Sequence, residues 1–102
     1  MDNITKQLQS FLVQLHYQPE QVSEKMVHYA EHLLHLLPAD HEQMLKTYFG
    51  LFGTNQQALA DIAHQHHLEP ESCMELIDSN LHKLAISPEW QLMNQIIQSK
   101  KS

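Results

Sequence analysis

The fold of this chain of 102 residues is decided by the stretch LPADHEQMLKTYFGLFGTNQQALADIAHQHHLEPESCMELIDSNLHKLA, which covers residues 37–85. Apolar residues recur there at helical spacing and predict a short helix over 57–66 and a longer helix opened by Pro70. The turn over 67–69 is short enough to make the pair a helix-turn-helix. His67 lies where such turns often use glycine, so we expect strained backbone at this residue.

Three further helices are predicted before this pair. The first covers 3–15, is capped by Asp2 or Asn3, and buries a stripe of Ile4, Leu8, Phe11, Leu12 and Leu15. The second covers 19–37 and buries a face made of Val22, Met26, Tyr29, Leu33, Leu36 and Leu37. A third helix is expected from a cap at Asp40 to about Phe49, followed by a loop over 50–55 that holds both glycines.

The C-terminal region is predicted to form a last helix opened by Pro88, with a frayed tail over 99–102. Its Trp90 is expected either to close the core or to anchor a partner. No stretch has the pattern of a strand. We therefore expect one all-α domain over 1–102, a bundle of five or six helices. It has an extra helix in 1–17, a region over 24–85 that contains the helix-turn-helix, and a C-terminal helix and tail in 86–102.

Charge excludes several classes of function. The chain has 12 acidic and six basic residues, all six of them lysines, and a net charge of −6. This balance argues against phosphate neutralisation on a nucleic acid and against anionic membrane surfaces. No apolar run reaches the roughly 18 residues of a membrane span. Cys73 is the only cysteine, so no intramolecular disulfide can form, and we expect a cytoplasmic protein.

One ungapped pattern runs through the deciding stretch and consists of Leu37, Leu45, Phe49-Gly50-Leu51, Leu59, Ile62-Ala63, Leu68, Glu71, Leu76 and Leu81-His82-Lys83-Leu84. With this pattern, and with the helix that precedes it, residues 24–85 resemble region 4 of the sigma-70 family of bacterial RNA polymerase factors. The resemblance implies a helix-turn-helix whose second helix reads the promoter −35 element. It also implies docking on the flap-tip helix of the polymerase β subunit.

The residues that would read DNA depart from the family. Arginine positions of the family hold Asp40, Pro70, Ser72 and Met74 here, and the base-reading glutamine is replaced by Glu75, whereas the acidic residue Glu71 is kept. Each lost bidentate arginine removes about 1–3 kcal/mol of base discrimination, and the added carboxylates repel phosphates. The resemblance therefore implies a degenerate DNA-recognition face.

The protein-binding positions of the resemblance remain apolar. The pocket that receives the flap-tip helix in the family corresponds here to Phe49, Leu51, Leu76, Leu81 and Leu84. A helix-in-groove contact needs little more than such a pocket. The same residues also suit the core of the helix-turn-helix, and the sequence leaves both interpretations open.

Histidines are the other unusual feature, since the chain has nine. His28, His32 and His35 lie on one side of the second predicted helix, at a spacing that can hold zinc or nickel. A solvated polar face is the simpler interpretation, and we expect no metal and no other cofactor. Because histidine titrates near pH 6.5, a pH-sensing role is a separate hypothesis. Cys73 is expected to be a buried, unreactive thiol.

These observations favour a transcription regulator that contacts the RNA polymerase β flap or a sigma factor and does not read the promoter itself. No catalytic arrangement is legible, so we expect no enzyme. One alternative is a DNA-binding regulator or small sigma-like factor that uses Lys46, Lys83, Lys100 and Lys101. A second alternative is a helical interaction module that senses metal or pH. The first helix would cover the bundle or pair two copies into a homodimer.

Overall fold

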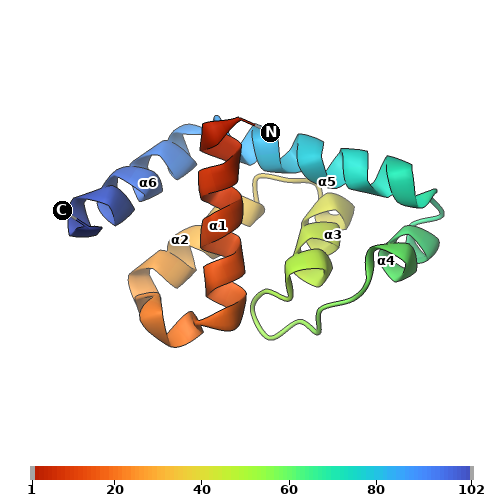
Figure 1. Ribbon diagram of the computed structural model, residues 1–102, viewed down its shortest axis with the longest axis horizontal. Helices are drawn as coiled ribbons and strands as arrows, with labels where there is room; N and C mark the ends of the chain where they lie inside the picture. Colours follow the sequence, from red (N-terminus) through yellow and green to blue (C-terminus); the bar gives the residue numbers. More distant parts are fainter. Residues whose placement is uncertain (1, 102) are drawn as a thin grey trace.

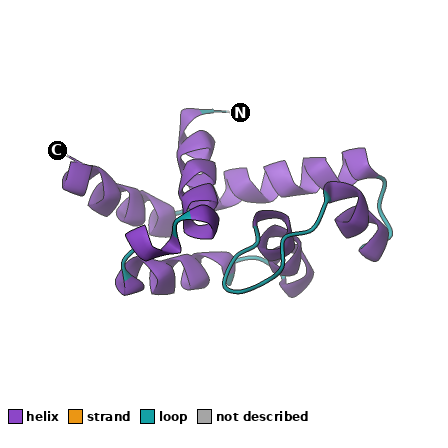
Figure 2. Ribbon diagram, turned by 60° about the horizontal axis from the view of Figure 1, so that its bottom comes forward, coloured by secondary structure: helices purple, strands orange, loops and turns teal. Residues whose placement is uncertain are grey.

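The computed structural model describes residues 2–101, with side chains described through residue 99. The described chain is all-helical and has no strand (Figures 1 and 2). Its elements are α1 (Asn3–Tyr17), the 3-10 helix η1 (Pro19–Gln21), α2 (Glu24–Leu34), α3 (Ala39–Phe49), α4 (Leu59–Gln65), α5 (Pro70–Ala85) and α6 (Pro88–Lys101). The all-α class expected from the sequence is confirmed, and none of these helices is long and apolar enough to cross a membrane.

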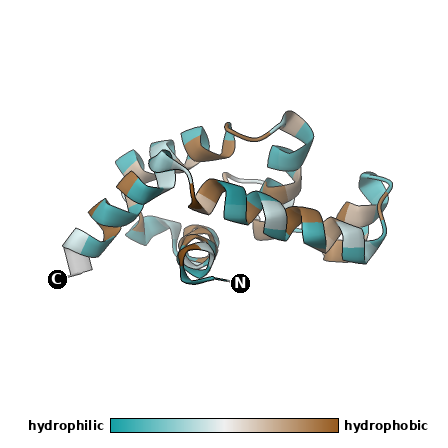
Figure 3. Cartoon of the chain, turned by 90° about the horizontal axis from the view of Figure 1, so that it is seen from above, coloured by the Kyte–Doolittle hydropathy of each residue, from teal (hydrophilic) through white to brown (hydrophobic). Residues whose placement is uncertain are grey.

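The long helix α5 organises the molecule. It packs against α1, α3, α4 and α6, while α2 packs against α6 (Figure 1). The described chain is elongated, 43 × 26 × 20 Å along its principal axes. Apolar and polar residues alternate around the helices in Figure 3, as expected when each helix buries one stripe against its neighbours.

A single apolar cluster joins all six α-helices. Its fully buried large side chains include Leu8 and Leu12 of α1, Leu45 of α3, Ile77 of α5 and Trp90 of α6. The rings of Phe11 and Trp90 lie 5.6 Å apart and connect α1 with α6. Trp90 therefore belongs to the core, which was one of the two roles expected for it.

The first helix differs from its expected buried face by one position. Ile4 was expected inside but is 44% exposed, whereas Thr5 is buried. Thr5 lies on the same face as Leu8 and Leu12, at i+3 and i+7, and this face points toward α5. Asp2 Oδ1 accepts a hydrogen bond of 2.7 Å from the backbone N–H of Thr5, so the expected capping role of Asp2 is confirmed.

The second helix is shorter than predicted, because η1 and an extended Val22 precede it. Ser23 Oγ accepts a hydrogen bond of 3.2 Å from the N–H of Met26 and caps α2, which ends at Leu34. Leu36 then lies in a turn, where it is 49% exposed and not in the core as expected. Ser23, a residue type that commonly caps helices, is the sequence signal that indicates the start of α2 after Pro19.

The third helix begins at Ala39 after Pro38, so the predicted cap at Asp40 is wrong. Asp40 lies inside the first turn, and its Oδ1 accepts a hydrogen bond from the N–H of His41. The following loop reaches Ala58, beyond its expected end at residue 55, and α4 starts at Leu59. Similarly, α6 continues to Lys101, where a frayed tail was expected.

Candidate functional site

The turn between α4 and α5 sets the direction of α5. The N–H of Leu68 donates to Ala63 O at 2.8 Å and the N–H of His67 donates to His64 O at 3.2 Å. These two bonds form a Schellman motif, which needs left-handed backbone at its second-last residue. His67 supplies it with φ 58°, so the strained backbone expected at this residue is confirmed. The result is a tight helical hairpin of α4 and α5, which pack directly against each other.

The outer face of α5 is acidic. Glu71, Glu75 and Asp78 are exposed at successive helical turns, and Ser72 is exposed beside them. None of the three carboxylates forms an ion pair within the described part of the chain. Pro70 is exposed and Met74 half-buried. Five of the six residues expected on the degenerate DNA-recognition face therefore share α5, and the sixth, Asp40, lies exposed on α3.

The five residues of the expected β-flap pocket do not line an open groove. Phe49, Leu51, Leu81 and Leu84 are at most 4% exposed and lie in the core. Leu76 is half-buried and is the one member with substantial access to solvent. The side chains of this set contribute mainly to packing of α3 and α5 in the described arrangement.

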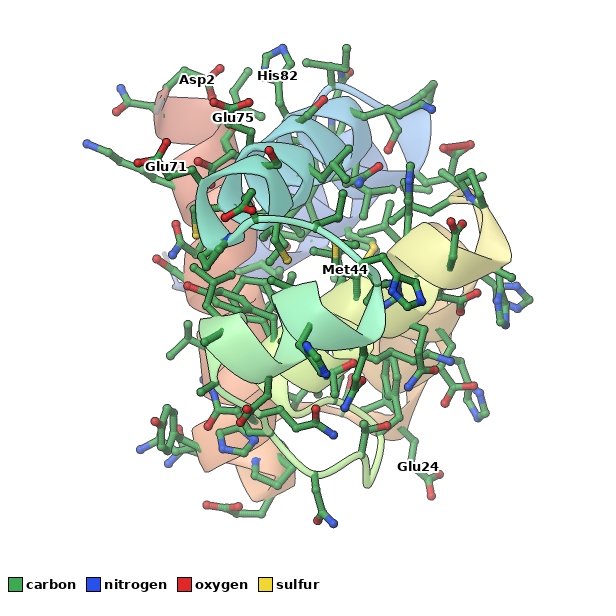
Figure 4. All side chains as sticks on the ribbon, turned by 90° about the vertical axis from the view of Figure 1, so that its right-hand side faces the viewer. Asp2, Glu24, Met44, Glu71, Glu75 and His82 are labelled. Atoms are coloured by element: carbon green, nitrogen blue, oxygen red, sulfur yellow. The ribbon has the colours of Figure 1, made fainter. Side chains whose placement is uncertain are left out.

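Helix α1 is held on α5 at its N-terminal end. His82 Nδ1 of α5 lies 3.1 Å from Asp2 Oδ2 and 3.4 Å from Thr5 Oγ1 (Figure 4). The pKa of Asp2 is lowered, chiefly by its hydrogen bonds from Thr5 and further by the nearby His82. Asp2 therefore serves both as the cap of α1 and as a contact between α1 and α5.

The C-terminal end of α1 has its own attachment. His16 Nδ1 donates a hydrogen bond of 2.9 Å to the carbonyl oxygen of Gly50 when that ring nitrogen is protonated. Gly50 has φ 67°, and a Cβ atom at this position would lie 2.7 Å from the His16 ring. Glycine is thus required both by the backbone conformation and by the close approach of α1.

Neither attachment was found from the sequence. His16 was not singled out, His82 was named only as part of the sigma-like pattern, and Thr5 was not included in the expected buried stripe. The partners are far apart in the chain: Thr5 and His82 are separated by 77 positions, and His16 and Gly50 by 34. Helix α1 packs against α3 and α5 of its own chain.

The three histidines considered as metal ligands are exposed. His28 and His32 lie on α2, and His35 lies just beyond its end. His35 Nδ1 lies 2.8 Å from Glu42 Oε2, which also pairs with Lys46 Nζ at 3.2 Å. Among residues 2–99, no group of three or more histidine, cysteine or carboxylate side chains is arranged to hold a metal ion.

Cys73 lies on the inner side of α5 and is fully buried, as expected. Burial raises the pKa of its thiol because the charged thiolate would lose its solvation. A thiol in this environment is not poised as a nucleophile.

A scan against protein-family models, a search of curated proteins and a search of solved structures each found no match to this chain. The fold and the site define an all-α protein with an acidic outer face on its longest helix.

Proposed function

We propose that this protein is a transcription regulator that contacts RNA polymerase or a sigma factor and does not read promoter DNA. The observation that supports this proposal is the row of Glu71, Glu75 and Asp78 on the outer face of α5. In the sigma-like interpretation, this is the face that would enter the major groove. Carboxylates without cationic partners on that face repel phosphates and favour a basic or neutral protein surface.

The protein contact would be centred on the exposed side of α5. Met74 is the half-buried apolar residue one helical turn from Glu71 and Asp78, and it would supply the apolar part of the contact. The rim of Glu71 and Glu75 would select a partner helix that carries lysine or arginine. A partner that instead used the buried Leu81 and Leu84 would have to displace covering elements, and α1 is fastened to that same helix α5.

DNA binding by lysines has little support from the described side chains. Lys46 is paired with Glu42 and Lys83 is exposed near the end of α5. The side chains of Lys100 and Lys101 lie outside the described residues. The alternative of a DNA-binding regulator is tested in the experiment below by measuring binding to a −35 duplex.

The experiment measures binding of the full chain to core RNA polymerase, to a β-flap-tip peptide, to a sigma factor and to a −35 duplex at low salt. We expect binding to at least one of the three protein partners and none to the duplex. Glu75→Lys should weaken protein binding, whereas Glu20→Lys, an equal charge change on the exposed η1, should not.

Two results would contradict the proposal. Absence of affinity for all three protein partners would remove the polymerase role. Salt-dependent binding to the −35 duplex, strengthened by Glu75→Lys, would instead favour the DNA-binding alternative.

A further inference from the structure

Two histidines on the outer side of α2 have no partner in the described fold. His28 and His32 are exposed, and neither forms a hydrogen bond or an ion pair within residues 2–99. By contrast, His16, His35 and His82 each contact an oxygen atom of another element. The imidazoles of His28 and His32 are therefore available to a ligand from solution.

The spacing of the two residues places their side chains on one face of the helix. Residues at i and i+4 of an α-helix lie one above the other, with Cβ atoms about 5–6 Å apart. Among the nine histidines of the sequence, His28 and His32 are the only two separated by four positions. Both lie inside α2, which runs from its Ser23 cap to Leu34. The helix thus fixes the separation of the two imidazoles before any ligand binds.

Two imidazoles one helical turn apart are a donor set for a transition metal ion. Neutral imidazole binds Zn²⁺, Cu²⁺ and Ni²⁺, with Zn–N distances of about 2.0–2.1 Å. Histidines at i and i+4 of a helix also supply two of the zinc ligands in H-E-x-x-H sites. Mg²⁺ and Ca²⁺ prefer oxygen ligands, so the pair selects against them.

The surroundings of the pair favour a cation. Glu24 lies one turn before His28 and Glu31 lies one turn after it, so both carboxylates share this side of α2. Neither carboxylate forms an ion pair within the described part of the chain, and Glu24 points away from the bundle in Figure 4. The Nζ atom of the adjacent Lys25 lies over the ring of Tyr29, 5.8 Å from its centre. Together with the net charge of −6, the two carboxylates raise the local concentration of divalent cations.

The donor set is incomplete within one chain. Zinc in proteins is usually four-coordinate, so two imidazoles leave two positions for water. Among residues 2–99, no third histidine, cysteine or carboxylate is arranged to join them. The next histidine, His35, is held by Glu42 at 2.8 Å. An ion bound by this pair is therefore exchangeable and lacks the three protein ligands of a catalytic zinc site.

We propose that His28 and His32 chelate one divalent transition metal ion on the outer face of α2. The ion bridges one turn of the helix and stabilises it, because only the helical form of this segment brings both imidazoles to the metal. The affinity follows the general order for nitrogen ligands, with Cu²⁺ bound more tightly than Zn²⁺. This site is independent of α5, so its test does not depend on polymerase binding.

The test titrates the full-length protein with each metal ion alone at about pH 7.5, where free imidazole is largely neutral. We expect saturable binding of one ion per chain, tighter for Cu²⁺ than for Zn²⁺, and none for Mg²⁺. Zn²⁺ should raise the melting temperature. With less than one equivalent of Cu²⁺, paramagnetic broadening of the amide resonances should be centred on residues 28–32.

Three variants locate the ion. His32→Ala should weaken binding by at least about tenfold, because only one imidazole of the pair remains. Glu24→His in this background restores two histidines one turn apart, at 24 and 28, and should recover most of the affinity. His64→Ala is the matched control, since it removes an exposed histidine of α4 and should leave binding unchanged. All three positions are exposed, and circular dichroism establishes that each variant is folded.

Absence of saturable binding of both Cu²⁺ and Zn²⁺ would overturn the proposal. Equal affinities of the unchanged protein and His32→Ala would also overturn it, as would broadening centred on residues 64–67, because other histidines would then hold the ion. If Glu24→His failed to recover the affinity lost in His32→Ala, the spacing of the pair would not be the cause of binding.

Discussion

Single residues fix the contacts that hold α1 in place. Gly50 and Asp2 lie at the two ends of this helix, and each has two functions. Gly50 ends α3 with left-handed backbone while its carbonyl oxygen receives His16. Asp2 caps α1 while its second oxygen faces His82.

Gly50→Ala should destabilise the protein more than Gly53→Ala. Both glycines have positive φ, 67° and 78°, so both substitutions force a side chain into left-handed backbone at about 1–2 kcal/mol. Only at position 50 does the new Cβ meet the His16 ring, whereas no atom lies within 4 Å at position 53. Urea unfolding measures the difference. Equal losses would mean that α1 moves away from Gly50 at no cost.

Asp2→Asn should reduce the loss of stability in acid. Because the pKa of Asp2 is lowered in the folded state from its ordinary value of 3.8, the ionised form stabilises the fold above that value. This stabilisation is lost as pH falls through the lowered pKa. Asparagine still caps α1 but does not titrate. Melting temperatures between about pH 6 and 2 should fall less steeply for Asp2→Asn, and parallel curves would contradict the assignment.

At the scale of elements, the sequence predicted helix centres well and helix ends poorly. Periodicity located all six α-helices, because each buries a stripe that repeats every three or four residues. The errors at Ser23, Asp40 and Leu36 lie at caps and turns. Several residues near each end could cap, and the choice depends on backbone angles that the sequence does not reveal.

The turn between α4 and α5 gives a prediction at the same scale. His67→Gly should stabilise the protein by about 0.5–1 kcal/mol, because glycine adopts φ 58° without the strain imposed on histidine. His66→Gly is the control, since this residue has φ −98° and gains nothing from glycine. Denaturant midpoints compare the two. A loss of stability in His67→Gly would indicate that the imidazole makes a contact worth more than the strain.

At the scale of the whole molecule, one apolar cluster ties the first helix to the last. Its part in the first two helices was largely predictable, since Leu8, Phe11, Leu12, Leu15, Met26, Leu33 and Leu37 were identified from spacing. The two attachments of α1 were not, because they depend on the angle between helices distant in the chain. For the candidate site, the sequence predicted the acidic residues of one helix. It left open whether the apolar residues of the expected pocket are exposed, and in the structure four of the five are buried.

Leu12→Ala should therefore weaken the whole fold and not α1 alone. Leu12 is fully buried, and truncating such a leucine costs about 2–5 kcal/mol. Val13→Ala, at the adjacent position that is 40% exposed, should cost less than about 1 kcal/mol. Unfolding followed by circular dichroism and by Trp90 fluorescence should give one coincident transition in Leu12→Ala. Separate transitions would show that α1 and α6 unfold independently.

The attachment of α1 to α5 also affects how the chain folds during synthesis. Thr5 leaves the ribosome long before His82, its partner 77 residues later. Until α5 emerges, α1 lacks its main packing partner, so part of the apolar stripe that holds Leu8 and Leu12 stays exposed in the nascent chain. The core around α1 is therefore completed only when the last third of the chain has been synthesised. The translation speed over that part sets how long the apolar stripe of α1 remains accessible to chaperones.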